Sequence, residues 1–356
     1  MSKLKLRWRN FSKSIPIAAV IIVFGGLGTA LLLTSHAATP TASVEAESGT
    51  VSSQASSVND STASGNLAVK FGTPTQTTNC LPNPHLCGFP DATNTGVPSG
   101  TTLTAYTGPT TITTAGTTID SKLIHGPVTV QAANVTIKNS LIYMDSTNVS
   151  GQNVGLWIRS GANSFLVSHT EVTGMYNGQQ SYCISALAND ATGATIDTVN
   201  MHDCGDGVRG GDLTATNNYI HAFWYGLING AAIDTPHADC FQGLQGDSNA
   251  IIRHNTCNNP NSAPPPGSPG YSNSVIQLGS EGGIPATNWT VDNNLFQGGG
   301  FSVNMRQTLL TGMSFTNNHW GRDNAYGLIG STTGDSYSWS GNVWDDTGLT
   351  ATASPG

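Results

Sequence analysis

A short unit of alternating apolar and polar residues recurs between residues 117 and 343. In each unit the alternation runs into a polar turn, and the turn is followed by another apolar position. Alternation with a period of two predicts short strands that are buried on one side. The units are "TTIDSKLI" (117–124), "VTIKNSLI" (135–142), "FLVSHTEV" (165–172), "ATIDTVNM" (194–201), "LTATNNYI" (213–220), "AIIRHNTC" (250–257), "WTVDNNLF" (289–296), "MSFTNNHW" (313–320) and "SYSWSGNV" (336–343).

Equivalent positions of these units lie 18 to 39 residues apart, so the strand motif is steady while the insertions vary. Such a pattern indicates a solenoid of stacked parallel coils, because no single coil can bury its own inward face. One turn position holds an asparagine in successive units, which predicts an internal ladder of hydrogen-bonded side-chain amides. An up-and-down barrel would give no such register. The column consists of Asn218, Asn255, Asn294, Asn318 and Asn342.

The stretches "TTLTAYTGPTTITTAGTTIDSKLI" (101–124) and "VTIKNSLIY" (135–143) resemble the opening of secreted bacterial proteins of the pectate-lyase-like superfamily. The resemblance implies an all-β fold, a right-handed parallel β-helix of about nine coils over 101–345, with a C-terminal tail at 346–356. The N-T-D, G-D-D and R-I-K motifs of polygalacturonases are absent, and no full pectate-lyase signature is present. The activity therefore stays open at this point.

The N-terminus has the pattern of an export signal. Five cations and no acid fall within the first fourteen residues, an apolar run follows at 15–33, and "SHAA" ends it at 35–38. This pattern predicts a signal peptide over 1–37, cleaved after Ala37, or an uncleaved signal anchor. Either alternative places the rest of the chain outside the cytoplasm, secreted or held on the outer face of the cytoplasmic membrane.

Residues 38–100 are predicted to form a Ser/Thr-rich linker. Within them "VEAESGTVSSQASSVNDSTASGNLAVKFG" (44–72) resembles the opening of carbohydrate-binding modules of families 6 and 35. The two strands of that opening lie too close together for a whole sandwich, so we interpret the stretch as a remnant or a stalk.

The net charge limits the classes of partner that the chain can bind, and the cysteine content indicates the compartment in which it folds. Without the five N-terminal cations, eight Lys and Arg remain against 21 Asp and Glu. This balance disfavours nucleic acid as a partner, and disfavours a membrane beyond the N-terminal segment, but leaves an acidic polysaccharide possible at a local cationic or metal site. Six cysteines in an exported chain suggest disulfides. We expect Cys80 to pair with Cys87 and to tie the N-terminal segment to the open end of the solenoid; the pairing of the other four stays open.

A second strand column carries the candidate chemistry. Aligning "DGVRG" (206–210) with "DCFQG" (239–243) places Asp206 beside Asp239 and Arg209 beside Gln242. Adjacent coils lie about 4.8 Å apart, so these four side chains are expected to converge. With His237 they would form one solvent-facing cleft that binds a glycan.

Two neighbouring carboxylates repel each other unless a cation or a proton lies between them. Asp206 and Asp239 could therefore act as acid and base in glycoside hydrolysis or could hold Ca²⁺. The resemblance implies a third chemistry, because pectate-lyase-like enzymes often combine Ca²⁺ with an Arg or Lys base. No lysine follows Lys138, which makes Arg209 the first basic candidate, with Arg253 and Arg306 in reserve.

Further polar and aromatic residues complete the predicted site. His202, His221 and His237 could move protons near neutral pH. Alignment of the units places His202 level with His221. Gln242, His221 and Arg253 would contact substrate, and the aromatic residues Tyr176, Trp224 and Tyr225 could stack on sugar rings. Trp157 is expected at an inward core position.

The string "HADCFQ" (237–242) is similar to an H-x-D-G-I-Q element of uncharacterised secreted β-helix proteins. The alternative is that both H-x-D strings only cap turns, where Asp and Asn are common. Three functions remain: an enzyme acting on an acidic glycan, lyase ahead of hydrolase; a non-catalytic glycan-binding adhesion protein; and a structural envelope protein. The glycan and the oligomeric state are not encoded in any motif.

Overall fold

The computed structural model describes thirteen stretches of the chain, and it divides the chain into two compact units, Met1–Thr75 and Gln76–Gly356. The stretches are 55–59, 67–71, 79–145, 153–174, 181–187, 191–223, 227–228, 231–232, 238–260, 273–280, 283–305, 309–331 and 334–353. In the first unit, β1 (Ala55–Asn59) pairs antiparallel with β2 (Leu67–Phe71). The predicted signal segment, 1–37, lies outside the described residues. Within the described residues, no helix is long and apolar enough to cross a membrane.

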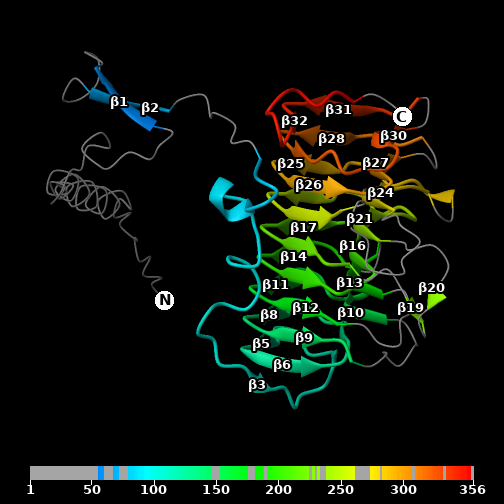
Figure 1. The fold of residues 1–356 in the computed structure, drawn as a ribbon. Helices are drawn as coiled ribbons and strands as arrows, with labels where there is room; N and C mark the ends of the chain where they lie inside the picture. The colour runs from blue at the N-terminus through cyan, green and yellow to red at the C-terminus, as the bar shows by residue number, and fades with distance from the viewer. Residues whose placement is uncertain are drawn as a thin grey trace, which may run out of the picture. The chain divides into compact units, whose positions relative to one another are not determined.

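The second unit is a right-handed parallel β-helix (Figure 1). Each coil contributes one strand to each of three all-parallel sheets, which we number in the order that the chain visits them. Sheet 1 contains β4 (Thr111–Ile112), β7 (Val128–Val130), β10 (Asn153–Ile158), β13 (Ser181–Ala186), β16 (Asp206–Gly210), β21 (Asp239–Gly243), β24 (Ser274–Leu278), β27 (Phe301–Met305) and β30 (Gly327–Ser331). Sheet 2 contains β5 (Thr118–Asp120), β8 (Thr136–Lys138), β11 (Leu166–Ser168), β14 (Ala194–Asp197), β17 (Leu213–Thr216), β22 (Ile251–Arg253), β25 (Thr290–Asp292), β28 (Met313–Thr316) and β31 (Tyr337–Ser340). Sheet 3 contains β3 (Thr104–Ala105), β6 (Lys122–His125), β9 (Leu141–Tyr143), β12 (Glu171–Thr173), β15 (Asn200–His202), β18 (Tyr219–His221), β23 (Thr256–Asn259), β26 (Leu295–Gly298), β29 (His319–Trp320) and β32 (Val343–Trp344).

Two smaller elements lie outside these sheets. A 3-10 helix spans Pro84–Cys87, and β19 (Leu227–Ile228) pairs antiparallel with β20 (Ala231–Ala232).

The repeat identified in the sequence is the register of sheet 2. Its inward positions stack in one column, and all except Trp339 are buried in the core. The nine strands of sheets 1 and 2 confirm the predicted number of coils. The column is Ile119, Ile137, Val167, Ile196, Ala215, Ile252, Val291, Phe315 and Trp339.

The predicted asparagine ladder is confirmed at the turn between sheets 2 and 3. Each Nδ2 donates to Oδ1 of the next coil, from Asn218 to Asn255 at 2.8 Å, from Asn255 to Asn294 at 3.0 Å and from Asn294 to Asn318 at 2.8 Å. Asn318 continues the chain of bonds to Asn342 at 2.9 Å. The same Oδ1 atoms also accept backbone N–H groups, so the ladder satisfies a buried turn that regular sheet bonding does not reach.

The residues preceding the solenoid form a strap (79–98) that packs against it. The Cys80–Cys87 disulfide is confirmed, and Cys80 packs with Phe89 against Leu295 of sheet 3. Farther along, the N–H of Gly96 donates to Thr198 O at 3.0 Å. Part of the predicted linker therefore lies on the side of the β-helix.

The Cys80–Cys87 loop is tied to the last coil, as expected, because Asn79 and Leu81 donate backbone hydrogen bonds to Asp345, directly after β32. The tail after β32 pairs the strand edge there: Thr350 forms an antiparallel bridge with Val343, and Trp339 Nε1 donates to Ala351 O at 2.7 Å. The exposed edge of the last coil is thus paired by the chain's own C-terminal residues.

The other four cysteines form two disulfides inside the solenoid, Cys183–Cys204 and Cys240–Cys257. Cys183 and Cys240 occupy inward positions of sheet 1, Cys257 lies in β23 of sheet 3, and Cys204 lies two residues after β15 of the same sheet. Three disulfides are typical of an extracellular protein.

Candidate site on the outer face of sheet 1

The outer face of sheet 1 carries two columns of side chains from adjacent coils. The strand positions between them, such as Leu156, Val208 and Phe241, point into the core. The first outer column is Val154, Tyr182, Asp206, Asp239, Ser274 and Phe301, and the second is Trp157, Ser185, Arg209, Gln242, Gln277 and Asn304. The predicted register is confirmed, because Val208 pairs with Phe241 and Arg209 with Gln242.

This register corrects the interpretation of Trp157 as a core residue. Leu156 and Ile158 point into the core and are fully buried, whereas Trp157 lies between them in the second outer column. Its ring is covered by the guanidinium of Arg159, 4.1 Å from the ring centroid. Trp157 is buried, but on the outer side of the sheet.

Asp239 is the centre of a buried polar network. Its Oδ1 accepts hydrogen bonds from Ser274 Oγ at 2.5 Å and Asn273 Nδ2 at 3.0 Å, and its Oδ2 accepts from Gln242 Nε2 at 3.1 Å and Asn273 Nδ2 at 3.1 Å. Gln277 joins the network, because its Oε1 accepts from Asn273 Nδ2 at 3.2 Å. Both oxygens of Asp239 are therefore engaged by donors on its own and the following coil.

Asp206 lies on the preceding coil and is also fully buried. Its Oδ1 accepts the backbone N–H of Asp239 at 2.8 Å, so the two carboxylates occupy the same face, as predicted. The exposure differs from expectation: Asp206, Asp239 and Gln242 are 0%, 0% and 1% exposed, whereas a solvent-facing groove was expected. Buried carboxylates persist when neighbouring donors replace water, which the network around Asp239 does.

Arg209 and Tyr182 are only partly buried and lie beside this network. Arg209 Nη1 donates to Tyr182 Oη at 3.1 Å, and the guanidinium lies 5.5 Å from the tyrosine ring centroid. Burial, followed by the charges of Asp206 and Asp239, raises the pKa of the Tyr182 phenol to about 12, against an opposing effect of Arg209. Tyr182 therefore stays protonated at neutral pH.

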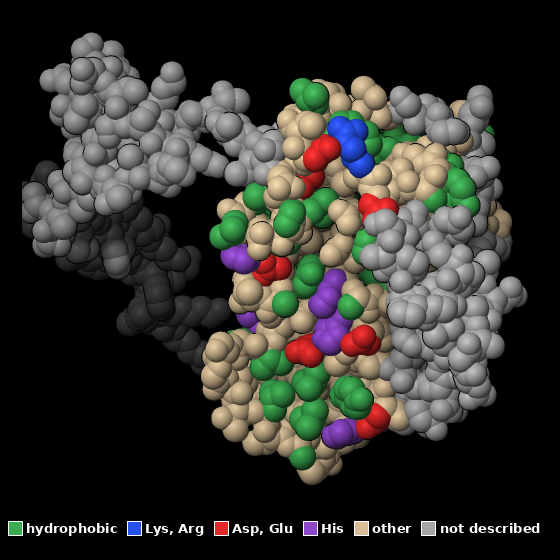
Figure 2. Space-filling view, in the orientation of Figure 1, with side chains coloured by type: hydrophobic (Ala, Val, Ile, Leu, Met, Phe, Trp, Pro, Cys, Tyr) green, Lys and Arg blue, Asp and Glu red, His purple; other side chains and the backbone are tan. Residues whose placement is uncertain are grey.

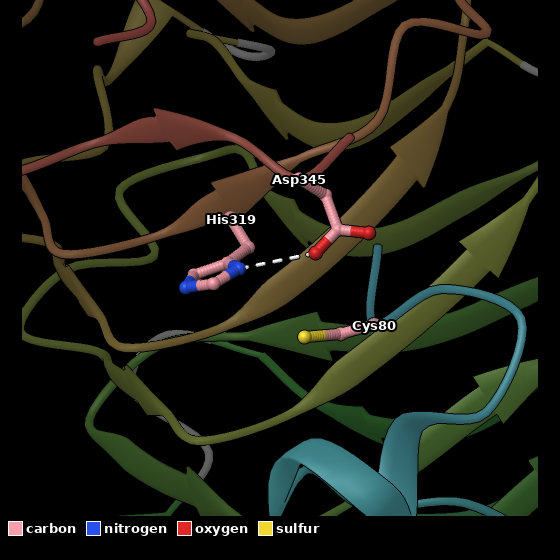
Figure 3. Close-up of side chains that lie close together, drawn as sticks. All are labelled: Cys80, His319 and Asp345. Carbon is pink, nitrogen blue, oxygen red and sulfur yellow. Dashed lines mark hydrogen bonds and ion pairs between the residues drawn. The ribbon is translucent and has the colours of Figure 1, made fainter. Parts of the chain in front are cut away.

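The arrangement around the two carboxylates does not fit Ca²⁺. At least three of their four oxygens accept hydrogen bonds from N–H or O–H groups, while Ca²⁺ takes about six to eight oxygen ligands. Among the described residues, one group of three metal-ligating side chains does come together, and it lies elsewhere: Cys80, His319 and Asp345 (Figure 3). Cys80 is bonded to Cys87, so its sulfur is not a thiolate ligand.

The predicted histidines lie on sheet 3. His202 stands level with His221, as expected, and their ring centroids are 5.2 Å apart. His202 Nδ1 lies 2.7 Å from Asp203 Oδ2, and its Nε2 lies 3.1 Å from Glu171 Oε1. Burial lowers the pKa of His202, but hydrogen bonds to Asp203 and Glu171 outweigh it and raise the pKa to about 9. For His221, burial and then the positive charge of His202 lower the pKa to about 4.

Sheet 3 therefore carries a protonated and a neutral histidine outside the sheet 1 network. In the view of Figure 2, histidine and acidic side chains gather together, and Lys and Arg occupy little of the visible surface.

The structure brings together four of the predicted site residues: Asp206, Arg209, Asp239 and Gln242. Arg253 lies on the outer face of sheet 2, where its Nε is 3.2 Å from Asp292 Oδ2. The predictions for His237, Tyr176, Trp224, Tyr225 and Arg306 lie outside the described residues. Their roles, like those of the four clustered residues, stay predictions.

Sequence reasoning missed Tyr182, Asn273, Ser274 and Gln277. Tyr182 and Ser274 open the stretches "YCISA" and "SVIQ", so they occupy the column of Asp206 and Asp239. Extending that column over neighbouring coils would have found both.

No family model matches the chain, and neither the curated proteins nor the solved structures include a match. The parallel β-helix is compatible with carbohydrate-active enzymes, but fold alone does not assign an activity.

Proposed function

We propose that this protein is an exported polysaccharide lyase that binds an acidic glycan on the outer face of sheet 1. The N-terminal segment would decide whether it is secreted or stays anchored to the membrane. The observation that carries the proposal is Arg209: a cation, bonded to Tyr182, in register with polar side chains of the adjacent coils.

Elimination from a uronate requires its carboxylate to be neutralised, because the proton to be removed lies on the adjacent carbon. A guanidinium suits this task, since it is permanently charged and can bind a carboxylate through two N–H groups. Arg209 is only half-buried, so a ligand can reach it. The second outer column could then bind successive sugars, because coils repeat about every 4.8 Å.

Asp206 is the carboxylate that we assign to remove the proton. Carboxylates serve as bases next to carbonyl groups in other enzymes. Asp206 suits that role better than Asp239, because it lies on the strand of Arg209 and opposite Tyr182, whereas Asp239 lies on the following coil. The hydrogen bonds that both oxygens of Asp239 accept also disfavour hydrolysis, which needs two working carboxylates.

A non-catalytic glycan-binding protein is the second candidate, and the complete burial of Asp206 and Asp239 favours it. In that case the network would only hold Arg209 and Tyr182 in place for binding.

The test is incubation of the exported protein with a panel of uronate polysaccharides, with Ca²⁺ or with a chelator. Ultraviolet absorbance of unsaturated ends, lost in Arg209→Gln but kept in the control Arg253→Gln, is the expected result. New reducing ends without that absorbance would identify a hydrolase. Binding without either product would identify a glycan-binding protein, and activity only with Ca²⁺ would contradict the metal-free site.

A further inference from the structure

Tyr182 is a titratable side chain on the outer face of sheet 1 that no motif indicated. It lies in β13, opposite Asp206 in the register of the first outer column. Unlike Asp206 and Asp239, it is only partly buried. It is therefore placed where a bound glycan and the buried carboxylates meet.

The hydrogen bond to Arg209 orients the phenol. A guanidinium has donors and no acceptor, so Tyr182 Oη must be the acceptor in the 3.1 Å contact. The hydroxyl proton therefore points away from Arg209 and is available for donation to another atom.

The protonation state of Tyr182 decides whether it can act as a general acid or as a general base. Because burial and the nearby aspartates raise the pKa of the phenol to about 12, it holds its proton at neutral pH. A sugar alkoxide is a poor leaving group that needs a proton as its bond to carbon breaks. A weak acid close to that oxygen can supply it, because it still carries its proton at the operating pH.

We propose that Tyr182 is the general acid of the elimination; this rests on the lyase function proposed above. Asp206 takes the proton from C5 of the uronate, and the C5 electron pair forms the C4=C5 double bond as the C4–O bond breaks. The departing oxygen takes the proton of Tyr182. Protonated Asp206, opposite Tyr182 on the next coil, then returns its proton to the phenolate, so the site regains its starting state.

Arg209 has two roles in this step. It binds the uronate carboxylate, and its N–H group already points at the oxygen that becomes the phenolate. A donor that is in place before charge develops costs no reorganisation during the reaction.

The experiment compares Tyr182→Phe with the matched control Tyr143→Phe, which changes an exposed tyrosine of sheet 3. Each variant is assayed on the polymer that the wild-type protein cleaves and on a uronide carrying 4-nitrophenoxy at C4. That group departs without a proton. Thermal unfolding confirms that both variants are folded.

We expect Tyr182→Phe to lower kcat on the polymer by about 100-fold or more, the usual contribution of a general acid, and to leave KM almost unchanged. On the nitrophenoxy substrate it should keep near wild-type activity. Equal losses on both substrates, or no loss on the polymer, would overturn the role of Tyr182 while leaving the lyase function standing. A wild-type protein that forms no unsaturated ends would overturn the lyase function itself, and the role of Tyr182 with it.

Discussion

The backbone N–H of Leu81 donates a hydrogen bond to Oδ2 of Asp345 at 3.0 Å, across 264 positions of the sequence. The other carboxylate oxygen of Asp345 lies 3.1 Å from His319 Nδ1, and the backbone carbonyl of Asp345 accepts the N–H of Asn79. Asp345 is 1% exposed. One buried residue thus fastens the strap to the last coil.

Replacing Asp345 with alanine should therefore destabilise the β-helix. The change leaves the N–H groups of Leu81 and His319 without their acceptor, so we expect the free energy of unfolding to fall by about 2 to 4 kcal/mol in urea titrations. Asp346→Ala is the control, because that neighbour is exposed and bonds Arg322 at the surface. Its loss should stay below about 1 kcal/mol. Equal losses would mean that Asp345 does not fasten the strap.

The asparagine ladder makes a second prediction about stability. Asn294→Ala removes a donor to Asn318 and an acceptor for Asn255, both fully buried. The unpaired groups and the cavity should together cost at least about 3 kcal/mol. Thr290→Ala, on the outer face of the same coil, should cost less than about 1 kcal/mol. If both variants lost similar amounts of the free energy of unfolding, the ladder would contribute little to stability.

The sequence predicted the coils, because the inward positions of a solenoid repeat locally. Ile252 and Val291 are such positions, and their neighbours in space follow from the repeat alone. The same reasoning placed Asp206 beside Asp239, since both follow from one alignment of two strands.

What could not be predicted depends on contacts that no repeat encodes. The hydrogen bond from Leu81 to Asp345 joins the strap to the last coil, and no sequence repeat relates these two segments. Trp157 was assigned to the wrong side because its neighbours Leu156 and Ile158 are equally apolar, so alternation alone did not fix the face. Burial of Asp239 depends on donors such as Asn273, which lies just before a strand and outside the aligned motif.

The histidine pair predicts that the free energy of unfolding falls on both sides of pH 6.5, for a different histidine on each side. His202 has a pKa of about 9 in the folded protein, above its ordinary value of 6.5. Its contribution to the free energy of unfolding is therefore complete below pH 6.5 and is lost as the pH rises through 9. His221 has a folded pKa of about 4, so its contribution is present above pH 6.5 and is lost as pH falls towards 4. Stability due to this pair should therefore be greatest near pH 6.5.

Glu171→Gln tests the origin of the His202 shift. Losing the carboxylate at Nε2 should lower the pKa of His202 in NMR titrations and reduce stability at pH 6 but not above pH 9. The control Asp145→Asn removes the partner of the exposed His125 and should leave His202 unchanged. A His202 pKa that does not move in Glu171→Gln would assign the shift to Asp203 alone.

Asp239→Asn separates a structural role of the sheet 1 network from a catalytic one. The new amide would direct a donor at Ser274, Asn273 or Gln242, all of which donate to Asp239. Because the site is fully buried, we expect a loss of about 2 to 3 kcal/mol in the free energy of unfolding. Asp212→Asn, at a partly exposed turn where Oδ1 accepts from Asn249, should lose less than about 1 kcal/mol. Glycan binding, measured at a temperature where both variants are folded, should survive in each of them, since Arg209 makes the charged contact. If Asp239→Asn kept its stability and lost all cleavage, Asp239 would belong to the reacting groups, and the assignment of the base to Asp206 would be wrong.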